Sequence, residues 1–353
     1  MNRITLNLSM FSEQYTGMGV YSMHIRNILK KNYSIYEILA NRKLADIQEN
    51  KTIWAPVSIT DGYSKAASLH RLYYLWRLPY KYDLGFVYTP THHGIPFYDN
   101  QLITIHDLIS LHFPEQHKLQ YWYFRYILPG IIKKCKGIVA VSNTTKDEVC
   151  RQYHVSHEFV YVLPNALTDV SFVTGDTIDH GYLLCVGAGF MHKNIHELLQ
   201  NARFWRDKYK VKIVSASGNY KEYIENIVKE RNLADKVSIE GFVSQSRLDE
   251  LYRHCSALVY PSKWEGFGIP PLEAMRYCKP VILSDIKIFR EIYQDSVIYV
   301  TLGSEKSWCD AFLKLSNMNE SPSNIKKRYK EILEKCSWNK NEKILMNIIS
   351  EIQ

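Results

Sequence analysis

The sequence predicts an α/β protein with two Rossmann-like domains, whose parallel sheets face each other across a cleft. Short apolar segments alternate with helical segments in two successive series, and this alternation indicates parallel strands joined by crossover helices. Each series opens with an apolar strand, a glycine-containing loop and a helix start, as a doubly wound sheet does. Between the series, residues 167–181 lack periodicity and form the predicted linker. We therefore expect one domain at 1–166 and another at 167–338.

Length, charge and composition narrow the class of protein. The chain has 353 residues and a formal net charge of +8, without the clustered basic stripe that is typical of nucleic-acid binding. It opens without an apolar signal segment, and no apolar run approaches the roughly 20 residues of a membrane span. The seven cysteines are scattered and form no CxxC pair, which indicates reduced thiols. We expect a cytoplasmic chain with no nucleic-acid partner, and its oligomeric state stays open.

The first series begins with a strand at 4–9 and a turn at 15–21, in which Gly17 and Gly19 open a helix. Further strands are predicted in short apolar runs at 34–39, 53–55, 84–88, 102–105 and 137–141. Helices are predicted at 122–136 and after Ser142 or Asn143, either of which suits an N-cap.

His106 and Asp107 follow the strand predicted at 102–105. Ligands of open α/β sheets bind at the carboxyl ends of the strands. A histidine there could donate a hydrogen bond to a ligand, or it could cap the next turn.

The second series starts with a strand at 182–186, followed by the loop 187–194 and a helix from Ile195. Its later strands are predicted at 211–215, 237–240, 257–260, 281–283 and 297–300. Lys193 lies at a helix start, where the helix dipole disfavours a cation unless an anion binds there. We expect this lysine to neutralise a diphosphate.

The segment 261–275 carries the strongest functional pattern. A buried strand stops at Pro261, a glycine-rich loop follows, and Pro270 and Pro271 suit the start of a helix. Unpaired N–H groups at such a start bind anions. Glu265 and Glu273 flank this loop, which favours a ligand that also carries hydroxyls, such as a nucleotide sugar. The alternative is that each glutamate is only a solvated charge.

This pattern of two glutamates around Gly-Phe-Gly and proline resembles the signature of the retaining family-4 glycosyltransferases, a GT-B group with many bacterial mannosyl- and rhamnosyltransferases. The resemblance extends to 106–107, 142–143, 164–165 and 187–193, and so covers nearly the whole chain. It implies that the last helix, 339–353, packs back on the first domain.

The resemblance also implies roles for these residues. His106, Lys193 and Glu265 would act in the chemical step, with Glu265 orienting sugar hydroxyls, and Glu273 would bind the ribose diol. The remaining motif positions would contact the substrates: Gly17, Gly19, Asp107, Gly187, His192, Gly266, Phe267, Gly268 and Ile269. Family members usually carry an arginine where this chain has Ala188. The diphosphate would then be held with help from His192 or Arg290, or by Lys193 and backbone amides alone.

The expected chemistry needs no cofactor and no metal. Metal-dependent GT-A transferases hold Mg²⁺ with an Asp-x-Asp pair, and this chain has none. The resemblance implies a front-face mechanism with retention, using GDP-mannose or dTDP-rhamnose as donor and a lipid-linked oligosaccharide as acceptor in surface polysaccharide or O-antigen synthesis.

A stretch of interleaved aromatic and basic residues suggests attachment to the inner membrane surface. It lies at 69–82 in the first domain, and residues 1–175 carry 18 basic against 13 acidic side chains. Its members are Arg71, Tyr73, Tyr74, Trp76, Arg77 and Lys81. A buried amphipathic helix is the alternative.

Three other functions remain open at this point. A nucleotide-sugar 2-epimerase shares the architecture, but the two-glutamate loop argues against it. An NAD-linked oxidoreductase would need Gly-x-Gly-x-x-Gly after a strand, and neither glycine loop fits. A non-catalytic binder of sugar nucleotides is the third.

Overall fold

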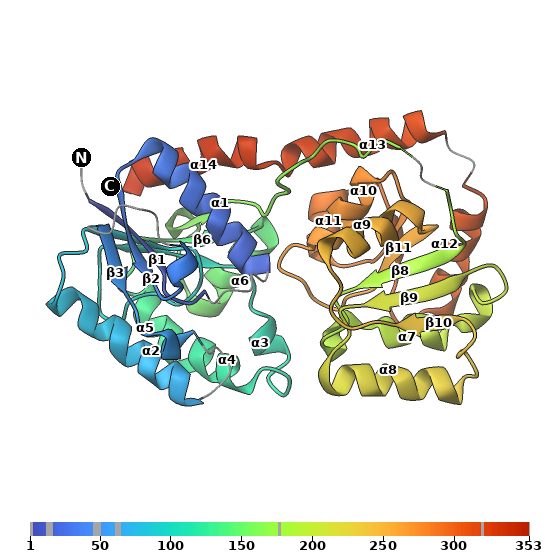
Figure 1. The fold of residues 1–353 in the computed structure, drawn as a ribbon, viewed down its shortest axis with the longest axis horizontal. Helices are drawn as coiled ribbons and strands as arrows, with labels where there is room; N and C mark the ends of the chain where they lie inside the picture. The colour runs from blue at the N-terminus through green and yellow to red at the C-terminus, as the bar shows by residue number, and fades with distance from the viewer. Residues whose placement is uncertain are drawn as a thin grey trace. The chain divides into compact units, whose positions relative to one another are not determined.

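The computed structural model describes residues 3–11, 17–44, 51–60, 65–175, 178–318 and 321–352. Residues 15 and 16 of the predicted glycine turn, and residues 176 and 177 of the predicted linker, lie outside these ranges. The chain divides into two compact units, residues 1–166 with 338–353 and residues 167–337. Figure 1 shows a sheet flanked by helices in each unit.

The first unit contains a sheet of seven parallel strands in the order β3-β2-β1-β4-β5-β6-β7. The strands are β1 (Ile4–Leu8), β2 (Ile35–Leu39), β3 (Thr52–Trp54), β4 (Phe86–Thr89), β5 (Gln101–Ile105), β6 (Gly137–Ala140) and β7 (Val160–Val162). All the strands predicted here are confirmed within two residues at either end, and β7 was not predicted. Strands β1, β4, β5 and β6 are buried along their whole length, as expected of a parallel sheet covered on both faces.

Helices cover both faces of this sheet. They are α1 (Gly17–Asn32), α2 (Lys65–Arg77), α3 (Ile109–His112), α4 (Lys118–Trp122), α5 (Leu128–Ile132), α6 (Asn143–Tyr153) and the last helix, α14 (Trp338–Ile352). Helix α14 lies beside α1 (Figure 1), where Trp338 stacks on His24 at 4.6 Å and the Lys31 ammonium pairs with Glu342 at 2.8 Å. Ser142 caps α6 as predicted, because its hydroxyl accepts a hydrogen bond from the Thr145 N–H at 3.0 Å.

Two predicted features of the first unit differ in detail from the structure. The segment predicted as helical at 122–136 is helical as far as Ile132, in a run that starts at Lys118 and contains a π-helical turn at Tyr123–Ile127 between α4 and α5. Pro129, near the start of α5, cannot donate a helix hydrogen bond, which favours an irregular turn just before it. Gly17 and Gly19 open α1 as predicted, but they are helical rather than in a turn, because packing of the buried face of that helix outweighs the poor helix propensity of glycine.

The second unit contains a sheet of six parallel strands in the order β10-β9-β8-β11-β12-β13. The strands are β8 (Tyr182–Val186), β9 (Lys210–Val214), β10 (Val237–Ile239), β11 (Ala257–Tyr260), β12 (Val281–Ser284) and β13 (Ile298–Val300). Each agrees with its predicted position to within one residue. The fold class predicted from the sequence, α/β with two parallel sheets, is therefore confirmed.

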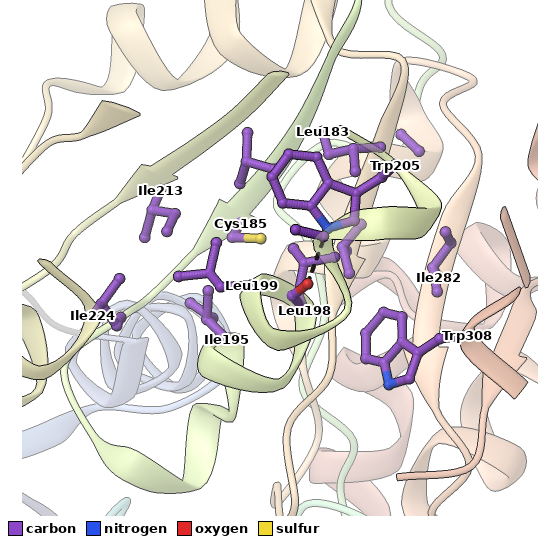
Figure 2. Packing of buried hydrophobic residues seen from close by; sticks show 14 of the residues in the cluster. Leu183, Cys185, Ile195, Leu198, Leu199, Trp205, Ile213, Ile224, Ile282 and Trp308 are labelled. Atoms are coloured by element: carbon purple, nitrogen blue, oxygen red, sulfur yellow. Dashed lines mark hydrogen bonds between the residues drawn. The ribbon is translucent and has the colours of Figure 1, made fainter. Parts of the chain in front are cut away.

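Helices flank the sheet of the second unit (Figure 1). They are α7 (Ile195–Gln200), α8 (Gly218–Glu230), α9 (Gln245–His254), α10 (Ile269–Arg276), α11 (Lys287–Tyr293), α12 (Glu305–Ser316) and α13 (Pro322–Lys335). Residues of α7, α8 and α12 share one apolar core with β8, β9 and β11. Figure 2 shows Trp205 and Trp308 in this core, and the Trp205 indole donates to the Leu198 carbonyl at 2.9 Å.

Candidate active site

The predicted donor-binding residues gather where the strand order of the second sheet reverses. Strand β8 lies between β9 and β11, so the chain crosses over at the β8–β11 pair. Ligands of open α/β sheets bind at such a switch point, beyond the carboxyl ends of the strands. The loop after β8 carries Gly187, His192 and Lys193, and the loop after β11 carries Glu265. The fold therefore brings these loops to the same edge of the sheet.

Lys193 and Glu265 form a buried ion pair at this edge. The Lys193 ammonium donates to Oε1 of Glu265 at 2.6 Å and to the Tyr260 hydroxyl at 3.0 Å. The side chains are only 17% and 9% exposed, respectively. Tyr260 is the last residue of β11, so the strand itself places the phenol within hydrogen-bond distance of the ammonium. The result is a fixed positive charge whose partners are one carboxylate and one phenol.

The pair stays charged although burial opposes it. Burial alone would raise the pKa of the Glu265 carboxyl, but the charge and hydrogen bond of Lys193, together with the nearby Ser262 hydroxyl and His192, lower that pKa below its ordinary value. Burial likewise works against the ammonium, yet Glu265 and Tyr260 raise the pKa of Lys193 above its ordinary value. Both groups therefore carry charge at neutral pH.

A carboxylate behind the loop fixes the place of Lys193. Lys193 ends a short 3₁₀ helix, and Asn194 turns the chain with a left-handed φ of 56°. The Asn194 amide donates to Oε2 of Glu197 at 2.6 Å. Oε1 of Glu197 accepts from the Trp308 indole at 2.8 Å and the Gly303 N–H at 2.6 Å. The loop is thus tied to the core residue Trp308 seen in Figure 2.

The loop after β11 ends at a position that requires glycine. Gly268 has a φ of +94°, and a Cβ there would lie 2.8 Å from the Phe289 ring. The Tyr293 hydroxyl donates to the Gly268 carbonyl. Helix α10 begins at Ile269, with Pro270 next and no side-chain N-cap, so its first turn can present backbone N–H groups to an anion. Gly266 and Phe267 are buried, and so contribute backbone rather than an exposed ring.

Glu273 lies in α10, about one turn from its start, and does not join the Lys193–Glu265 pair. Its Oε2 accepts a hydrogen bond from the Tyr252 hydroxyl of α9 at 2.7 Å. Burial raises the pKa of the Glu273 carboxyl above its ordinary value, although the Tyr252 hydrogen bond opposes that shift. The two glutamates of the predicted motif therefore occupy different electrostatic environments.

The structure also describes the positions proposed to replace the missing arginine. Ala188 is fully buried and belongs to the apolar core of the unit, while Gly187 turns the chain with a φ of +85°. The Arg290 guanidinium forms a bidentate pair with Asp285, at 2.7 and 2.8 Å. His192 is buried and directly precedes Lys193 in the loop after β8. His192 is thus better placed than Arg290 to assist Lys193.

His106 lies in the first unit, at the end of β5, and its ring meets the Tyr21 ring of α1 edge-on at 4.8 Å. Burial lowers the pKa of His106 to about 4, so the imidazole is neutral at pH 7. Its Nε2 lies 3.0 Å from the Pro90 carbonyl, which can only accept, so Nε2 carries the proton. Nδ1 is then an acceptor, whereas the sequence predicted a donor to the ligand. In a hydrogen bond between His106 and a ligand, a ligand hydroxyl would therefore donate to Nδ1.

The other predicted residues of the first unit either follow His106 in the sequence or belong to α1, the helix whose Tyr21 contacts His106. Asp107 accepts the Ile109 N–H at 3.0 Å and so supports the start of α3. Gly17 begins α1, and Tyr21, one turn later, reaches the His106 ring. Across the residues that the structure describes, no three His, Cys, Asp or Glu side chains are grouped so as to hold a metal ion.

Two tyrosines of the site were not predicted. Tyr260 contacts Lys193, and Tyr252 contacts Glu273. Tyr252 precedes Glu273 by 21 residues, and no spacing rule links two positions on separate helices. For Tyr260, a signal existed, because a tyrosine ending an otherwise aliphatic strand beside Pro261 places a hydroxyl at the ligand-binding edge.

The proposed membrane cluster in α2 needs a correction. Arg71 is buried, and its guanidinium donates to the Ile59 carbonyl at 2.6 and 3.0 Å, so it cannot meet a lipid headgroup. The Tyr74 hydroxyl likewise donates a hydrogen bond to the Trp54 carbonyl at 3.1 Å. An aromatic–basic patch remains exposed, and it consists of Tyr73, Trp76, Arg77, Tyr80 and Lys81. Among the described helices, none is both long and apolar enough to span a bilayer.

Comparison with known proteins gives the family. Residues 173–332 match the model for glycosyl transferases group 1, and residues 46–169 match the model for glycosyltransferase family 4. The O-antigen chain mannosyltransferase RfbU of Salmonella typhimurium is 33% identical over 98% of this chain and 99% of its own length. The O-antigen chain mannosyltransferase B of Escherichia coli is 25% identical over 58% of this chain and 59% of its own.

Solved structures support the same fold. Sucrose-phosphate synthase from Thermosynechococcus elongatus superposes with a TM-score of 0.77 at 15% identity, over 100% of this chain and 99% of that one. HepE of Anabaena, solved in complex with UDP-glucose, superposes with a TM-score of 0.73 at 14% identity, over 99% of this chain and 100% of that one. With its two parallel sheets, its two-glutamate loop and its full-length similarity to RfbU, the chain belongs to the family-4 glycosyltransferases of the GT-B fold.

Proposed function

We propose that this glycosyltransferase moves a mannosyl group from GDP-mannose to a lipid-linked oligosaccharide, with retention of anomeric configuration, during O-antigen assembly. Similarity to RfbU over almost the whole chain supports the sugar and the pathway. The structural neighbour HepE was solved with UDP-glucose, which supports a nucleotide-sugar donor in this fold. The observation that carries the proposal is the Lys193–Glu265 pair at the switch point of the second sheet.

In the proposed reaction, the bond between C1 of the sugar and the phosphate oxygen breaks while a bond to the acceptor oxygen forms on the same face. The acceptor proton passes to the leaving phosphate oxygen. Lys193 stabilises the charge that grows on the diphosphate, and the first N–H groups of α10, from Gly268 and Ile269, assist. Glu265 orients hydroxyls of the sugar, and His106 accepts a hydrogen bond from a substrate hydroxyl through Nδ1.

The ribose contact favours a ribonucleotide donor. Glu273 is proposed to accept hydrogen bonds from the 2′- and 3′-hydroxyls of the nucleotide. GDP-mannose carries both hydroxyls, whereas dTDP-rhamnose lacks the 2′-hydroxyl and would leave acceptor capacity unused. For this reason, we place GDP-mannose ahead of dTDP-rhamnose.

The test is turnover of labelled GDP-mannose with and without a lipid extract that contains lipid-linked oligosaccharide. We expect label in the lipid fraction only when the extract is present, with an α-linked mannose by NMR. Acceptor-independent release of mannose or its 2-epimer would indicate the epimerase alternative. Binding of GDP-mannose without turnover would indicate a non-catalytic binder. UDP- and dTDP-sugars in the same assay test the choice of donor.

We further propose that the aromatic–basic patch holds the enzyme on the cytoplasmic face of the inner membrane, where a lipid-linked acceptor is found. Tyr73, Trp76 and Tyr80 are 54%, 37% and 74% exposed, and Trp76 lies 5.9 and 5.7 Å from the other two rings. Exposed aromatic rings suit the headgroup layer, and each base near an anionic surface contributes about 1 kcal/mol. Arg77 and Lys81 are the bases of the patch.

Flotation with anionic vesicles tests this attachment. Binding should fall as salt rises, because the Debye length is only about 10 Å at 0.1 M salt. Replacing Arg77 and Lys81 by serine should abolish binding but leave turnover of a soluble acceptor analogue intact. Replacing Lys208 and Lys229, exposed lysines of the second unit, is the control that removes the same charge elsewhere. Binding that survives the Arg77 and Lys81 changes would contradict the role of the patch.

A further inference from the structure

Glu273 is held by a single hydrogen bond that the sequence did not reveal. Across the described residues, the Tyr252 hydroxyl is the one hydrogen-bond donor to this carboxylate, at 2.7 Å from Oε2. Tyr252 is 1% exposed, and its ring lies parallel to the Tyr277 ring at a centroid distance of 5.7 Å. Burial and the neighbouring carboxylate raise the pKa of the Tyr252 phenol well above its ordinary value, so the group remains a donor at every pH of interest.

The two oxygens of the Glu273 carboxylate differ in their hydrogen bonding. Oε2 accepts a hydrogen bond from a phenol that is buried on α9 and stacks on the Tyr277 ring. Oε1 has no donor within the described part of the chain. A carboxylate with one oxygen fixed in this way keeps one rotamer, and its free oxygen is ready to accept hydrogen bonds from a ligand.

We propose that Tyr252 is a positioning residue for the donor: it holds Oε2 of Glu273 so that Oε1 can accept the ribose hydroxyls of the nucleotide. This inference rests on the proposed role of Glu273 as the ribose acceptor. Tyr252 itself touches no substrate, and its effect passes through the carboxylate alone.

The same hydrogen bond favours the ionised form of Glu273. Burial raises the pKa of the carboxyl and nearby Asp249 raises it further, while the Tyr252 hydroxyl and the Arg276 charge lower it. These are the charged and titratable groups that face Glu273 from α9 and α10. Only the carboxylate form accepts two hydroxyls, so nucleotide affinity should fall as pH drops through this pKa. Loss of the Tyr252 hydroxyl should move that fall to higher pH.

The experiment measures GDP binding by calorimetry between pH 5 and 8 for the wild type, Tyr252→Phe, Glu273→Gln and the double variant. We expect Tyr252→Phe to raise the Kd about tenfold at pH 7, and to shift the acid limb upward by about one pH unit. The double variant should bind no more weakly than Glu273→Gln, because the phenol acts only through the carboxylate. Tyr182→Phe is the matched control, since the Tyr182 hydroxyl also bonds to α9, at the Leu251 carbonyl 2.8 Å away, but not to Glu273.

The outcomes separate the two claims. Wild-type affinity in Glu273→Gln overturns the ribose role of Glu273, and the proposal for Tyr252 with it. Weak binding in Glu273→Gln together with a wild-type Kd and pH profile in Tyr252→Phe overturns the role of Tyr252 alone. If Tyr252→Phe further weakens the Glu273→Gln variant, the tyrosine acts through packing and the proposal fails.

Discussion

Glu265 and Glu273 belong to one motif, Glu265 in its loop and Glu273 in the helix that follows, yet their carboxyl pKa values are shifted in opposite directions. Glu265 meets an ammonium at 2.6 Å and has a lowered pKa. Glu273 meets only a neutral phenol at 2.7 Å and has a raised pKa. The cause is position: Glu265 faces the loop after β8, which carries Lys193, whereas Glu273 sits inside α10 against α9. Identical side chains in one motif therefore serve as the counter-ion of a lysine and as the acceptor of a phenol hydrogen bond.

The difference between the two glutamates also indicates which interactions must change when the donor binds. Lys193 is already neutralised by Glu265, so a diphosphate can use the ammonium only by sharing it with that carboxylate. Tyr260 gives the ammonium a second partner that carries no charge, at 3.0 Å. We infer that this phenol keeps Lys193 in place when Glu265 turns toward sugar hydroxyls. Glu273 forms no ion pair among the described residues, so in its proposed role it has no such pair to break before it accepts hydroxyls.

Removing the cation should have the largest effect. Lys193→Met takes away the charge opposite the diphosphate, and we expect kcat/KM to fall by about 10³-fold. It also strands a buried carboxylate, which costs about 3–5 kcal/mol of unfolding free energy. The double variant Lys193→Met with Glu265→Gln should regain much of this stability but no activity. Steady-state kinetics and denaturant unfolding measure the two effects.

The control for this experiment is Lys263→Met, which removes an exposed lysine from the loop after β11. Its activity and stability should match the wild type. An active Lys193→Met enzyme would show that backbone amides suffice to hold the diphosphate.

Replacing His106 should lower kcat by about 10²-fold while the fold survives, because the ring is proposed to supply one hydrogen-bond acceptor to the reacting substrates. The pKa of about 4 predicts that kcat shows no limb from this group between pH 6 and 8. Turnover of His106→Ala across this range measures both effects, with His24→Ala, a change in α1 outside the site, as control. A limb near pH 6.5 that vanishes in His106→Ala would contradict the neutral tautomer.

The contrast between the glutamates should appear directly in stability. At pH 7, Glu265→Gln should lose about 3 kcal/mol of unfolding free energy, since it breaks the buried pair. Because the pKa of Glu265 is lowered by folding, this loss should shrink as pH falls through that pKa. Glu273→Gln should instead gain up to about 1 kcal/mol at pH 7, since an ionised group with a raised pKa opposes folding. This gain should also vanish toward acid pH.

Urea unfolding of both variants and the wild type, followed from pH 4 to 7.5, measures these differences. Equal losses in the two variants would show that the glutamates share one environment, and would remove the basis of the comparison.

Sequence patterns were sufficient where a local rule applies. Period and turn chemistry located the strands, the Ser142 cap and the helix start at Ile269. The loop motif at 261–275 predicted both glutamates, and the helix start after the loop 187–194 predicted Lys193. What could not be predicted depends on contacts between separate elements: the hydrogen bonds of Arg71 to the Ile59 carbonyl, the proton on Nε2 of His106, and the hydroxyl of Tyr252. No spacing along the chain encodes which helix a side chain meets.

Chelation should have the smallest effect, namely none. A diphosphate leaving group needs positive charge nearby, and GT-A enzymes supply it with a metal held by an Asp-x-Asp pair that this chain lacks. Here the buried ammonium of Lys193 is proposed to supply it, and it needs no added ion. Turnover in excess EDTA should therefore equal turnover in Mg²⁺. Adding Mg²⁺ to Lys193→Met should not rescue it, because Glu265 alone offers too few oxygen ligands for that ion. Activity that is lost on chelation and restored by Mg²⁺ or Mn²⁺ would show that Lys193 does not suffice and that the diphosphate also needs a metal ion.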